Sequence, residues 1–303
     1  MTDTDFDEAL DRVECLRGRE RSVEKLPGGL TNVNLKVTTA EHTVVVRIPQ
    51  PGSDLLLIDR EHEHQNSRLA AAAGVGAPVL QYVEDPGLLV VGFLEGRTYS
   101  DDDLRHGGHL PRIAAACRRL HASGRFVNDF DMFRVQRTYL ATVRSRGFRL
   151  PDGYLDFEDQ VTEIQRVLAG APVATVPCNN DLLAGNFIDD GDRIWLIDYE
   201  YSGNNDPYFE LGNLWSEPDL SLEQLEELVE AYDGELRLSR VARTRLWALM
   251  AKYGWTLWGS IQASTSAIDY DFWSWATEKY DRAVAEFEGP DLPRLLAEVA
   301  EER

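Results

Sequence analysis

The sequence predicts an α+β fold of two lobes, a small N-terminal lobe with an antiparallel sheet and one helix, and a larger, mostly helical C-terminal lobe. Two observations lead to this prediction. The 303 residues exceed the length of one ordinary domain. Near Gly96 the pattern changes from short β-branched strands to long helical stretches. We place the lobes at residues 1–95 and 96–303 and expect a ligand to bind between them.

The N-terminal lobe is predicted to begin with a short charged helix within residues 1–20 and to contain one further helix over 59–73. Asp59 can cap this second helix, and glycines at 74 and 76 end it. Four strands are predicted to pair as two hairpins, the second turning at residues 84–87; the strands are 34–37 with 42–48, and 78–82 with 88–93.

The C-terminal lobe is predicted to contain helices over 112–124, 156–170, 221–234 and 239–265. A single hairpin interrupts them, in which strands 186–189 and 193–198 flank the turn Asp190-Gly191-Asp192. No internal repeat is visible, so the lobe is not expected to be a repeat array.

The charge balance restricts the class of partner. The chain has 31 basic and 52 acidic residues, a net charge of −21. This charge repels nucleic-acid phosphates and anionic lipid, so we expect neither a nucleic-acid nor a membrane-surface partner. A cationic small-molecule substrate would be attracted, although an acidic surface that only keeps the protein in solution is an equally valid interpretation.

The cysteines and the N-terminus indicate a cytoplasmic protein. Cys15, Cys117 and Cys178 are odd in number and far apart, so neither a disulfide framework nor a zinc site is predicted. The start MTDTDFDEAL is acidic and polar, unlike a signal peptide, and no run reaches the roughly 18 apolar residues of a membrane span.

Two segments carry the chemistry, CNNDLLAGN at 178–186 and WLIDYEY at 195–201. The predicted hairpin would return Asp198 to the neighbourhood of Asp181 and Asn186. Phosphoryl transfer needs a base near the attacking hydroxyl and hard oxygen ligands for Mg²⁺. Asp181 fits the base, and Asn186 and Asp198 fit the metal ligands. Aspartate and asparagine are also common turn residues, but their conjunction with an apolar strand ending in Asp198 favours catalysis over coincidence.

These segments closely resemble the kinase-like family of choline/ethanolamine kinases and aminoglycoside phosphotransferases, with CNNDLLAGN as catalytic loop and IDYEY as metal-binding segment. The resemblance runs from about residue 26 to 287 and implies a protein-kinase-like fold that uses ATP and Mg²⁺. It also implies the nucleotide-binding residues. Arg47 of VVVRIP would hold phosphates and Glu63 would orient it; GGLTN would cover the phosphates and the interlobe segment would meet the adenine, with candidates Gly28, Gly29, Thr31, Asn32, Phe93 and Leu94. Read alone, Arg47 would be an edge-strand charge and GGLTN a hairpin turn.

The long C-terminal helix suggests the acceptor. Trp247, Ala251, Trp255, Trp258 and Gln262 recur at helical spacing on one face, which usually indicates core, and we assign Trp247 to the core. Residues 253–276 also resemble the aromatic wall of the alcohol site in choline/ethanolamine kinases. A quaternary ammonium suits such a wall. By resemblance Tyr201, Trp255, Trp258 and Trp275 would line it. Glu217 would add negative charge, unless it is only a solvated carboxylate at a helix end.

Two departures from the family pattern concern the loop and the substrate. Asn179 stands where the family has His, so we expect weaker support of the catalytic loop. After Glu217, PDLSLEQ replaces an aromatic-rich continuation, so one wall of a choline site would be missing. The sequence therefore predicts an ATP-dependent kinase for a small amino alcohol, choline first and ethanolamine second. Phosphotransfer to an aminoglycoside or another cationic metabolite, and a kinase-shaped binding protein without transfer, remain alternatives.

Overall fold

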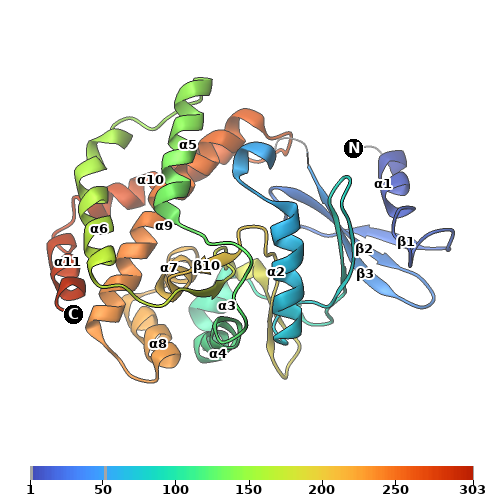
Figure 1. The fold of residues 1–303 in the computed structure, drawn as a ribbon, viewed down its shortest axis with the longest axis horizontal. Helices are drawn as coiled ribbons and strands as arrows, with labels where there is room; N and C mark the ends of the chain where they lie inside the picture. The colour runs from blue at the N-terminus through green and yellow to red at the C-terminus, as the bar shows by residue number, and fades with distance from the viewer. Residues whose placement is uncertain (1–2, 51–52, 303) are drawn as a thin grey trace.

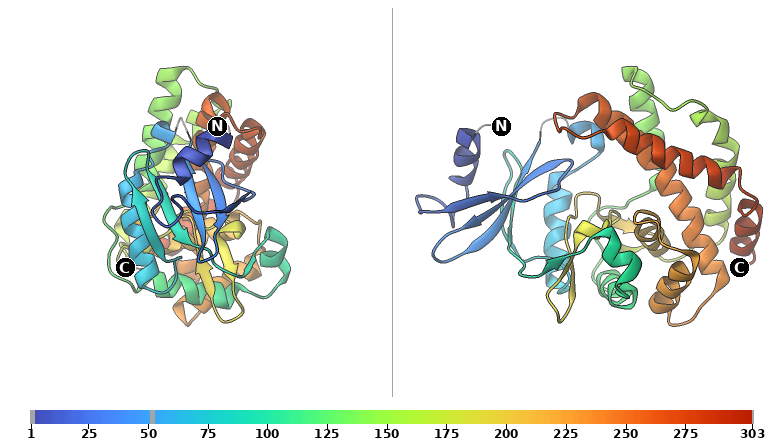
Figure 2. Two further views of the ribbon diagram at one scale, coloured as in Figure 1. Left: turned by 90° about the vertical axis from the view of Figure 1, so that its right-hand side faces the viewer. Right: turned by 180° about the vertical axis from the view of Figure 1, so that it is seen from behind.

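The computed structural model describes residues 3–50 and 53–302 and divides into a small sheet-containing part and a larger helical part (Figure 1). The sheet lies at one end of the molecule, and helix α2 (Arg60–Ala72) stands between it and the helical part. The right-hand view of Figure 2 shows α9 (Leu238–Thr265) and α10 (Phe272–Phe287) in the helical part, away from the sheet. This arrangement agrees with the predicted α+β class.

The small lobe is built on one antiparallel sheet of five strands in the order β1-β2-β3-β5-β4. Its alternating strand residues bury one face against α1, with Leu35, Val37 and Val46 at most 1% exposed. Both predicted hairpins are confirmed, whereas β1 was not predicted. The strands are β1 (Ser22–Lys25), β2 (Asn32–Thr38), β3 (Thr43–Pro49), β4 (Val79–Val83) and β5 (Leu88–Gly92).

The N-terminal helix is shorter than predicted. Helix α1 is Asp3–Leu10, and the chain then makes turns up to Gly18, which has a φ of +67°. The prediction over 1–20 was therefore wrong beyond Leu10, and residues 1 and 2 lie outside the described part. Val13 and Leu16 are fully buried, so these turns are held by packing on the sheet.

The predicted cap of α2 is confirmed, because the Asp59 side chain accepts a hydrogen bond from the backbone N–H of His62 at 3.0 Å. This cap fixes the start of the helix and so the position of Glu63, which lies one turn inside it and is 2% exposed. A short 3₁₀ helix, η1 (Ser53–Leu56), precedes α2.

Helix α9 is the centre of the large lobe, and it packs against α5, α7, α10 and α11. Almost every side chain from Val241 to Gln262 is buried, and Trp247 is core as predicted. The lobe also contains η2 (Tyr154–Phe157) and the helices α3 (Asp101–His106), α4 (Leu110–His121), α5 (Met132–Arg146), α6 (Glu158–Gly170), α7 (Pro207–Ser216), α8 (Leu222–Asp233) and α11 (Leu292–Ala300).

Two small sheets carry the predicted catalytic segments. The predicted hairpin is confirmed as β8 (Phe187–Asp189) and β9 (Ile194–Leu196), and β6 (Arg97–Thr98) adds to it. A second sheet, which was not predicted, pairs β7 (Val176–Cys178) with β10 (Gly203–Asn205). Between β7 and β8 the chain forms η3 (Ala184–Asn186). Strands β5 and β6 flank residues 95 and 96, and the lobe boundary there stays a prediction. Among the described helices, none is long and apolar enough to cross a membrane.

Candidate active site

Asn179 forms hydrogen bonds with both of the predicted catalytic segments. Its side-chain N–H groups donate to the carbonyl oxygens of Ile197 at 3.1 Å and Asp198 at 2.8 Å, and its Oδ1 accepts from the N–H of Asp181 at 3.1 Å. The residue is fully buried. A single amide therefore joins the backbone of the predicted base to that of the predicted metal ligand. Asn179 thus supports the loop through three hydrogen bonds, and the expectation that this support is weaker than with His stays a prediction.

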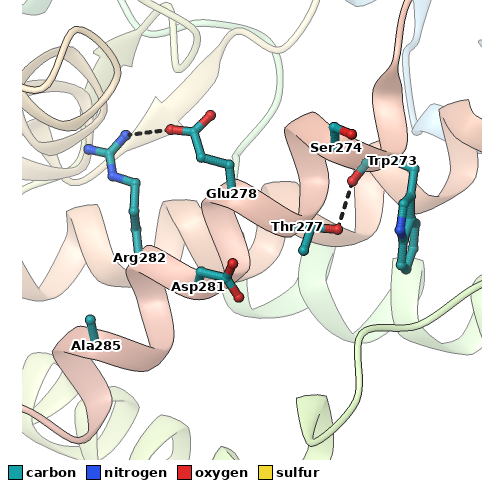
Figure 3. Close-up of a pocket in the computed structure, with 7 residues that line it drawn as sticks. All are labelled: Trp273, Ser274, Thr277, Glu278, Asp281, Arg282 and Ala285. Carbon is teal, nitrogen blue, oxygen red and sulfur yellow. Dashed lines mark hydrogen bonds and ion pairs between the residues drawn. The ribbon is translucent and has the colours of Figure 1, made fainter.

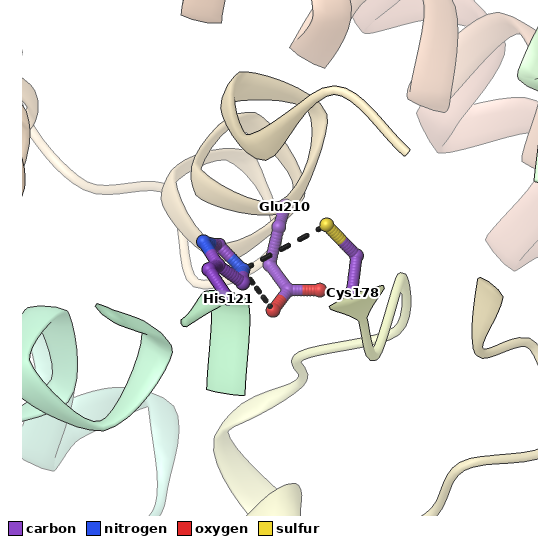
Figure 4. A group of neighbouring side chains, drawn as sticks. All are labelled: His121, Cys178 and Glu210. Carbon is purple, nitrogen blue, oxygen red and sulfur yellow. Dashed lines mark hydrogen bonds and ion pairs between the residues drawn. The ribbon is translucent and has the colours of Figure 1, made fainter. Parts of the chain in front are cut away.

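A second support lies under the catalytic loop, where His121 of α4, Cys178 of β7 and Glu210 of α7 point toward one another (Figure 4). Glu210 Oε2 accepts from the backbone N–H of Asn180 at 2.8 Å, and Glu210 Oε1 lies 3.1 Å from His121 Nε2. The other ring nitrogen of His121 lies 2.8 Å from the Tyr232 hydroxyl. Asn180 has a left-handed φ of 68°, which Asn tolerates better than most residues.

The same three side chains also have the spacing of a metal site, since their ligand atoms lie within 4.8 Å of one another. Burial, and then the charge of Glu210, raises the pKa of the Cys178 thiol well above its usual range, which disfavours the thiolate that binds metals. Both carboxylate oxygens of Glu210 already have hydrogen-bond partners. We therefore interpret the cluster as hydrogen-bonded support of the loop.

Asp198 has the features of a cation ligand. Its Oδ2 pairs with the Arg47 guanidinium, whereas its Oδ1 is buried with no hydrogen-bond partner within the described structure. A buried carboxylate oxygen without a partner is costly and is a natural ligand for a hard cation. The Asn186 amide donates to the carbonyl oxygen of Asp181 at 2.7 Å, which holds Asn186 next to the same loop. These residues fit Mg²⁺.

Asp181 sits in an electrostatically unfavourable place. Burial, followed by the charges of Asp198, Glu200 and Glu217, raises the pKa of Asp181 well above its usual range, and Lys279 opposes the shift. A carboxylate with a raised pKa accepts a proton more readily, which suits a base near a reacting hydroxyl.

An ion-pair network extends from this site into the small lobe. Arg47 of β3 lies 2.5 Å from Glu63 and also pairs with Asp198. Arg60 lies 2.7 Å from Glu63 and 3.2 Å from Glu200. The predicted pairing of Arg47 with Glu63 is thus present. Arg60 and Glu200 were missed, although Glu200 belongs to the IDYEY segment and Arg60 to DREHE.

The glycine turn lies against the same network. Thr31 Oγ1 donates to Glu200 at 2.6 Å and the Asn32 amide donates to it at 2.8 Å. Gln262 of α9 donates to the carbonyl oxygen of Leu30 at 2.8 Å. At Gly29, with a φ of +80°, a Cβ would lie 2.7 Å from the Asn32 carbonyl oxygen. The turn therefore requires glycine there, and contacts from the large lobe hold it in place.

Phe93 and Leu94 are half-buried on the segment that follows β5. The N–H of Phe93 donates to the carbonyl oxygen of Thr43 at 3.2 Å, and the Lys36 ammonium lies 4.0 Å from the centre of the Phe93 ring. The structure thus brings this segment to the start of β3, the strand that carries Arg47.

Four predicted acceptor residues form a continuous aromatic row, which we define as Tyr201, Trp255, Trp258 and Trp275. Trp258 Nε1 donates to the Tyr201 hydroxyl at 2.8 Å. The Tyr201 and Trp255 ring centres lie 5.1 Å apart, and so do those of Trp258 and Trp275, both edge to face. Such pairs add to the energy of burial. The row begins three residues after Asp198 and ends on α10.

Glu217 lies beside this row but is not a free charge. Lys279 of α10 donates to both of its carboxylate oxygens at 2.6 Å, and the same ammonium lies 4.4 Å from the centre of the Trp275 ring. Both residues are largely buried, so the interpretation of Glu217 as a solvated carboxylate is wrong. The pair also removes the net negative charge that we expected from Glu217. Lys279 was not among the predicted site residues.

The outer face of α10 carries a separate open groove of about 610 Å³ (Figure 3). Seven residues from Trp273 to Ala285 line it, and none of them is a predicted site residue. Arg282 and Glu278 form a 3.7 Å ion pair within it. The groove is therefore distinct from the residues that surround Asp181.

Comparison with known proteins shows which protein family this chain resembles. The family model for choline/ethanolamine kinase matches residues 23–228. Protein LicA of Haemophilus influenzae is 31% identical over 249 residues, covering 74% of this chain and 71% of LicA. A probable ethanolamine kinase of Arabidopsis thaliana is 29% identical over 302 residues, covering 86% of this chain and 78% of that protein. The crystal structure of a choline/ethanolamine kinase family protein from Mesorhizobium loti matches with a TM-score of 0.86 at 34% identity, covering 98% of this chain and 99% of that one.

Proposed function

The chain belongs to the choline/ethanolamine kinase family, and we propose that it transfers the terminal phosphoryl group of ATP to the hydroxyl of a small amino alcohol, choline first and ethanolamine second. The family confirms the predicted kinase-like fold and the class of enzyme, a phosphotransferase with an alcohol acceptor. One observation carries the proposal for this chain. Asn179 joins the loop that contains Asp181 and Asn186 to the segment that contains Asp198. Arg47 from the small lobe forms an ion pair with the carboxylate of Asp198.

Each of these residues has a role in the proposed reaction. Asp181 would accept or orient the proton of the acceptor hydroxyl, and Asn186 and Asp198 would hold Mg²⁺, which would supply charge neutralisation at the phosphates. Arg47, braced by Glu63, would hold the phosphates. The remaining nucleotide contacts would come from Gly28, Gly29, Thr31, Asn32, Phe93 and Leu94. Such a site acts by positioning and electrostatics.

Removal of a metal ligand should change the Mg²⁺ requirement. Asn186→Ala is expected to raise the Mg²⁺ concentration for half-maximal rate by more than about tenfold, because even outer-shell changes cost about 10–100-fold in metal affinity. EDTA should abolish turnover of the wild type, and added Mg²⁺ should restore it. The measurement is a Mg²⁺ titration of the rate at fixed ATP. An unchanged titration curve would remove Asn186 from the metal site.

The aromatic row should bind the cation of the acceptor. Trp258→Ala is expected to raise the KM for choline about 5–30-fold, because a desolvated cation–π contact contributes about 1–2 kcal/mol. The KM for ATP should stay the same. Trp247→Ala is the matched control, since Trp247 belongs to the same helix but donates to Asp206 at 2.8 Å in the core. An unchanged choline KM in Trp258→Ala would make Trp258 a core residue only.

The choice of acceptor is tested by ADP release with a panel of choline, ethanolamine and aminoglycosides. The proposal predicts ADP release above the acceptor-free rate with choline or ethanolamine, and a higher kcat/KM for choline than for ethanolamine. A response to aminoglycosides alone would favour the alternative phosphotransferase. Binding of Mg·ATP without ADP release on any acceptor would favour a binding protein.

A further inference from the structure

Lys279 is a buried positive charge built into the predicted acceptor site. It is 4% exposed and makes two 2.6 Å hydrogen bonds, one to each carboxylate oxygen of Glu217. Its ammonium also lies over the Trp275 ring, 4.4 Å from the ring centre. A carboxylate and an aromatic face are the two groups that would recognise a substrate ammonium, and here an ammonium of the protein itself contacts both.

The pair is joined to the aromatic row through Trp275, which Lys279 contacts. Trp275 contacts Trp258, Trp258 donates to Tyr201, and Tyr201 lies three residues after Asp198 in the predicted metal-binding segment. The pair therefore lies beside the surface that the substrate cation is proposed to contact.

Primary and quaternary ammonium groups place different demands on such a site. A primary ammonium has three N–H donors, and each must find an acceptor when the group leaves water. A quaternary ammonium has no N–H and is held by ring faces and by charges at longer range. Lys279 already donates to both oxygens of Glu217, so this carboxylate offers a primary ammonium little hydrogen bonding.

We propose that Lys279 determines acceptor specificity by occupying Glu217, so that the site favours a quaternary over a primary ammonium alcohol. This inference rests on the proposed function, because it concerns the acceptor of the same reaction. The carboxylate is present but engaged, and the members of the aromatic row that Lys279 does not contact, Tyr201, Trp255 and Trp258, are left as the main binding surface for the substrate cation.

A second buried ion pair on the same helices provides a matched control. Lys252 of α9 is 3% exposed and lies 2.7 Å from Glu286 of α10, with its ammonium 5.4 Å from the centre of the Trp215 ring. Its chemistry is that of the Lys279 pair, but it contacts no member of the aromatic row among the described contacts. Lys252→Met therefore measures the effect of breaking a buried lysine–glutamate pair that does not engage Glu217.

The experiment measures kcat/KM for choline and for ethanolamine in Lys279→Met, Lys279→Arg, Lys252→Met and the wild type. In Lys279→Met, Glu217 is free, and the choline-to-ethanolamine ratio should fall by about tenfold or more, the effect of one charge-assisted hydrogen bond. Lys279→Arg and Lys252→Met should keep the wild-type ratio. In the double variant Glu217→Gln with Lys279→Met, the ratio should return toward the wild-type value. An unchanged ratio in folded Lys279→Met would overturn the proposal.

If Lys279→Met does not fold, a measurement on the wild type alone can still contradict the proposal. The acceptors are ethanolamine, its N-methyl and N,N-dimethyl forms, and choline, which lose N–H donors one at a time. The proposal predicts that kcat/KM rises along this series, and a flat or falling series would contradict it. No activity on any of the four would instead contradict the proposed function, so the two failures are distinguishable.

Discussion

Asp181→Asn is expected to lower kcat by about 10²–10⁴-fold, the usual contribution of a positioned base. The amide keeps the shape of the side chain but cannot accept the hydroxyl proton. Binding of Mg·ATP should persist, because the metal is assigned to Asn186 and Asp198. The fold should be at least as stable as the wild type, since the half-buried Asp181 carboxylate lies among the charges of Asp198 and Glu200.

The control is Asp192→Asn, which changes an exposed carboxylate in the turn of the β8–β9 hairpin. It should leave kcat unchanged. Steady-state kinetics, nucleotide titration and thermal melting of both variants complete the comparison. Full activity in Asp181→Asn would remove the assignment of the base, whereas loss of nucleotide binding together with activity would make Asp181 a part of the nucleotide site.

Glu210→Ala is expected to have the largest effect on the support of the site. The change removes the acceptor of the Asn180 N–H and the partner of His121 in a fully buried place. Each lost hydrogen bond to a charged group costs about 1.5–3 kcal/mol, so the free energy of unfolding should fall by about 3 kcal/mol or more. Because Asn180 precedes Asp181, kcat of the folded variant should also fall.

Glu286→Ala separates these two effects. It leaves Lys252 buried without its partner and should also reduce stability, but it lies away from the catalytic loop. Urea unfolding gives the stability of each variant, and kcat is measured well below both melting temperatures. Reduced stability with full kcat in Glu210→Ala would limit Glu210 to the fold, and unchanged stability would contradict its role as a support.

The elements of the fold that could be predicted from the sequence are those with a strong local periodicity of apolar residues. The β-branched hairpins of the small lobe and the long apolar α9 follow from residue periodicity alone. Helix α5 was missed although Asp131 caps its start and Gly147, with a φ of 66°, ends it. The β7–β10 pair could not be predicted, because its short strands are brought together by tertiary packing.

The site residues also divide into those that the local sequence indicates and those that only tertiary packing brings together. Asp181, Asn186 and Asp198 belong to two short segments of recognisable chemistry, so the sequence indicated them directly. Lys279 did not stand out, because its partner Glu217 is 62 residues away and only the packing of α10 beside the end of α7 joins them. Asn179 was recognised as unusual, but the three hydrogen bonds that it makes depend on the conformation of both segments.

Transfer of a phosphoryl group to an amino alcohol is tested by identification of the product. The wild-type protein is incubated with Mg·ATP and choline, and the acceptor is analysed by mass spectrometry beside the same reaction with Asp181→Asn. We expect a phosphomonoester of choline in amounts equal to the ADP formed, and almost none with the variant. ADP and free phosphate with choline unchanged, or no ADP with choline or ethanolamine, would contradict it.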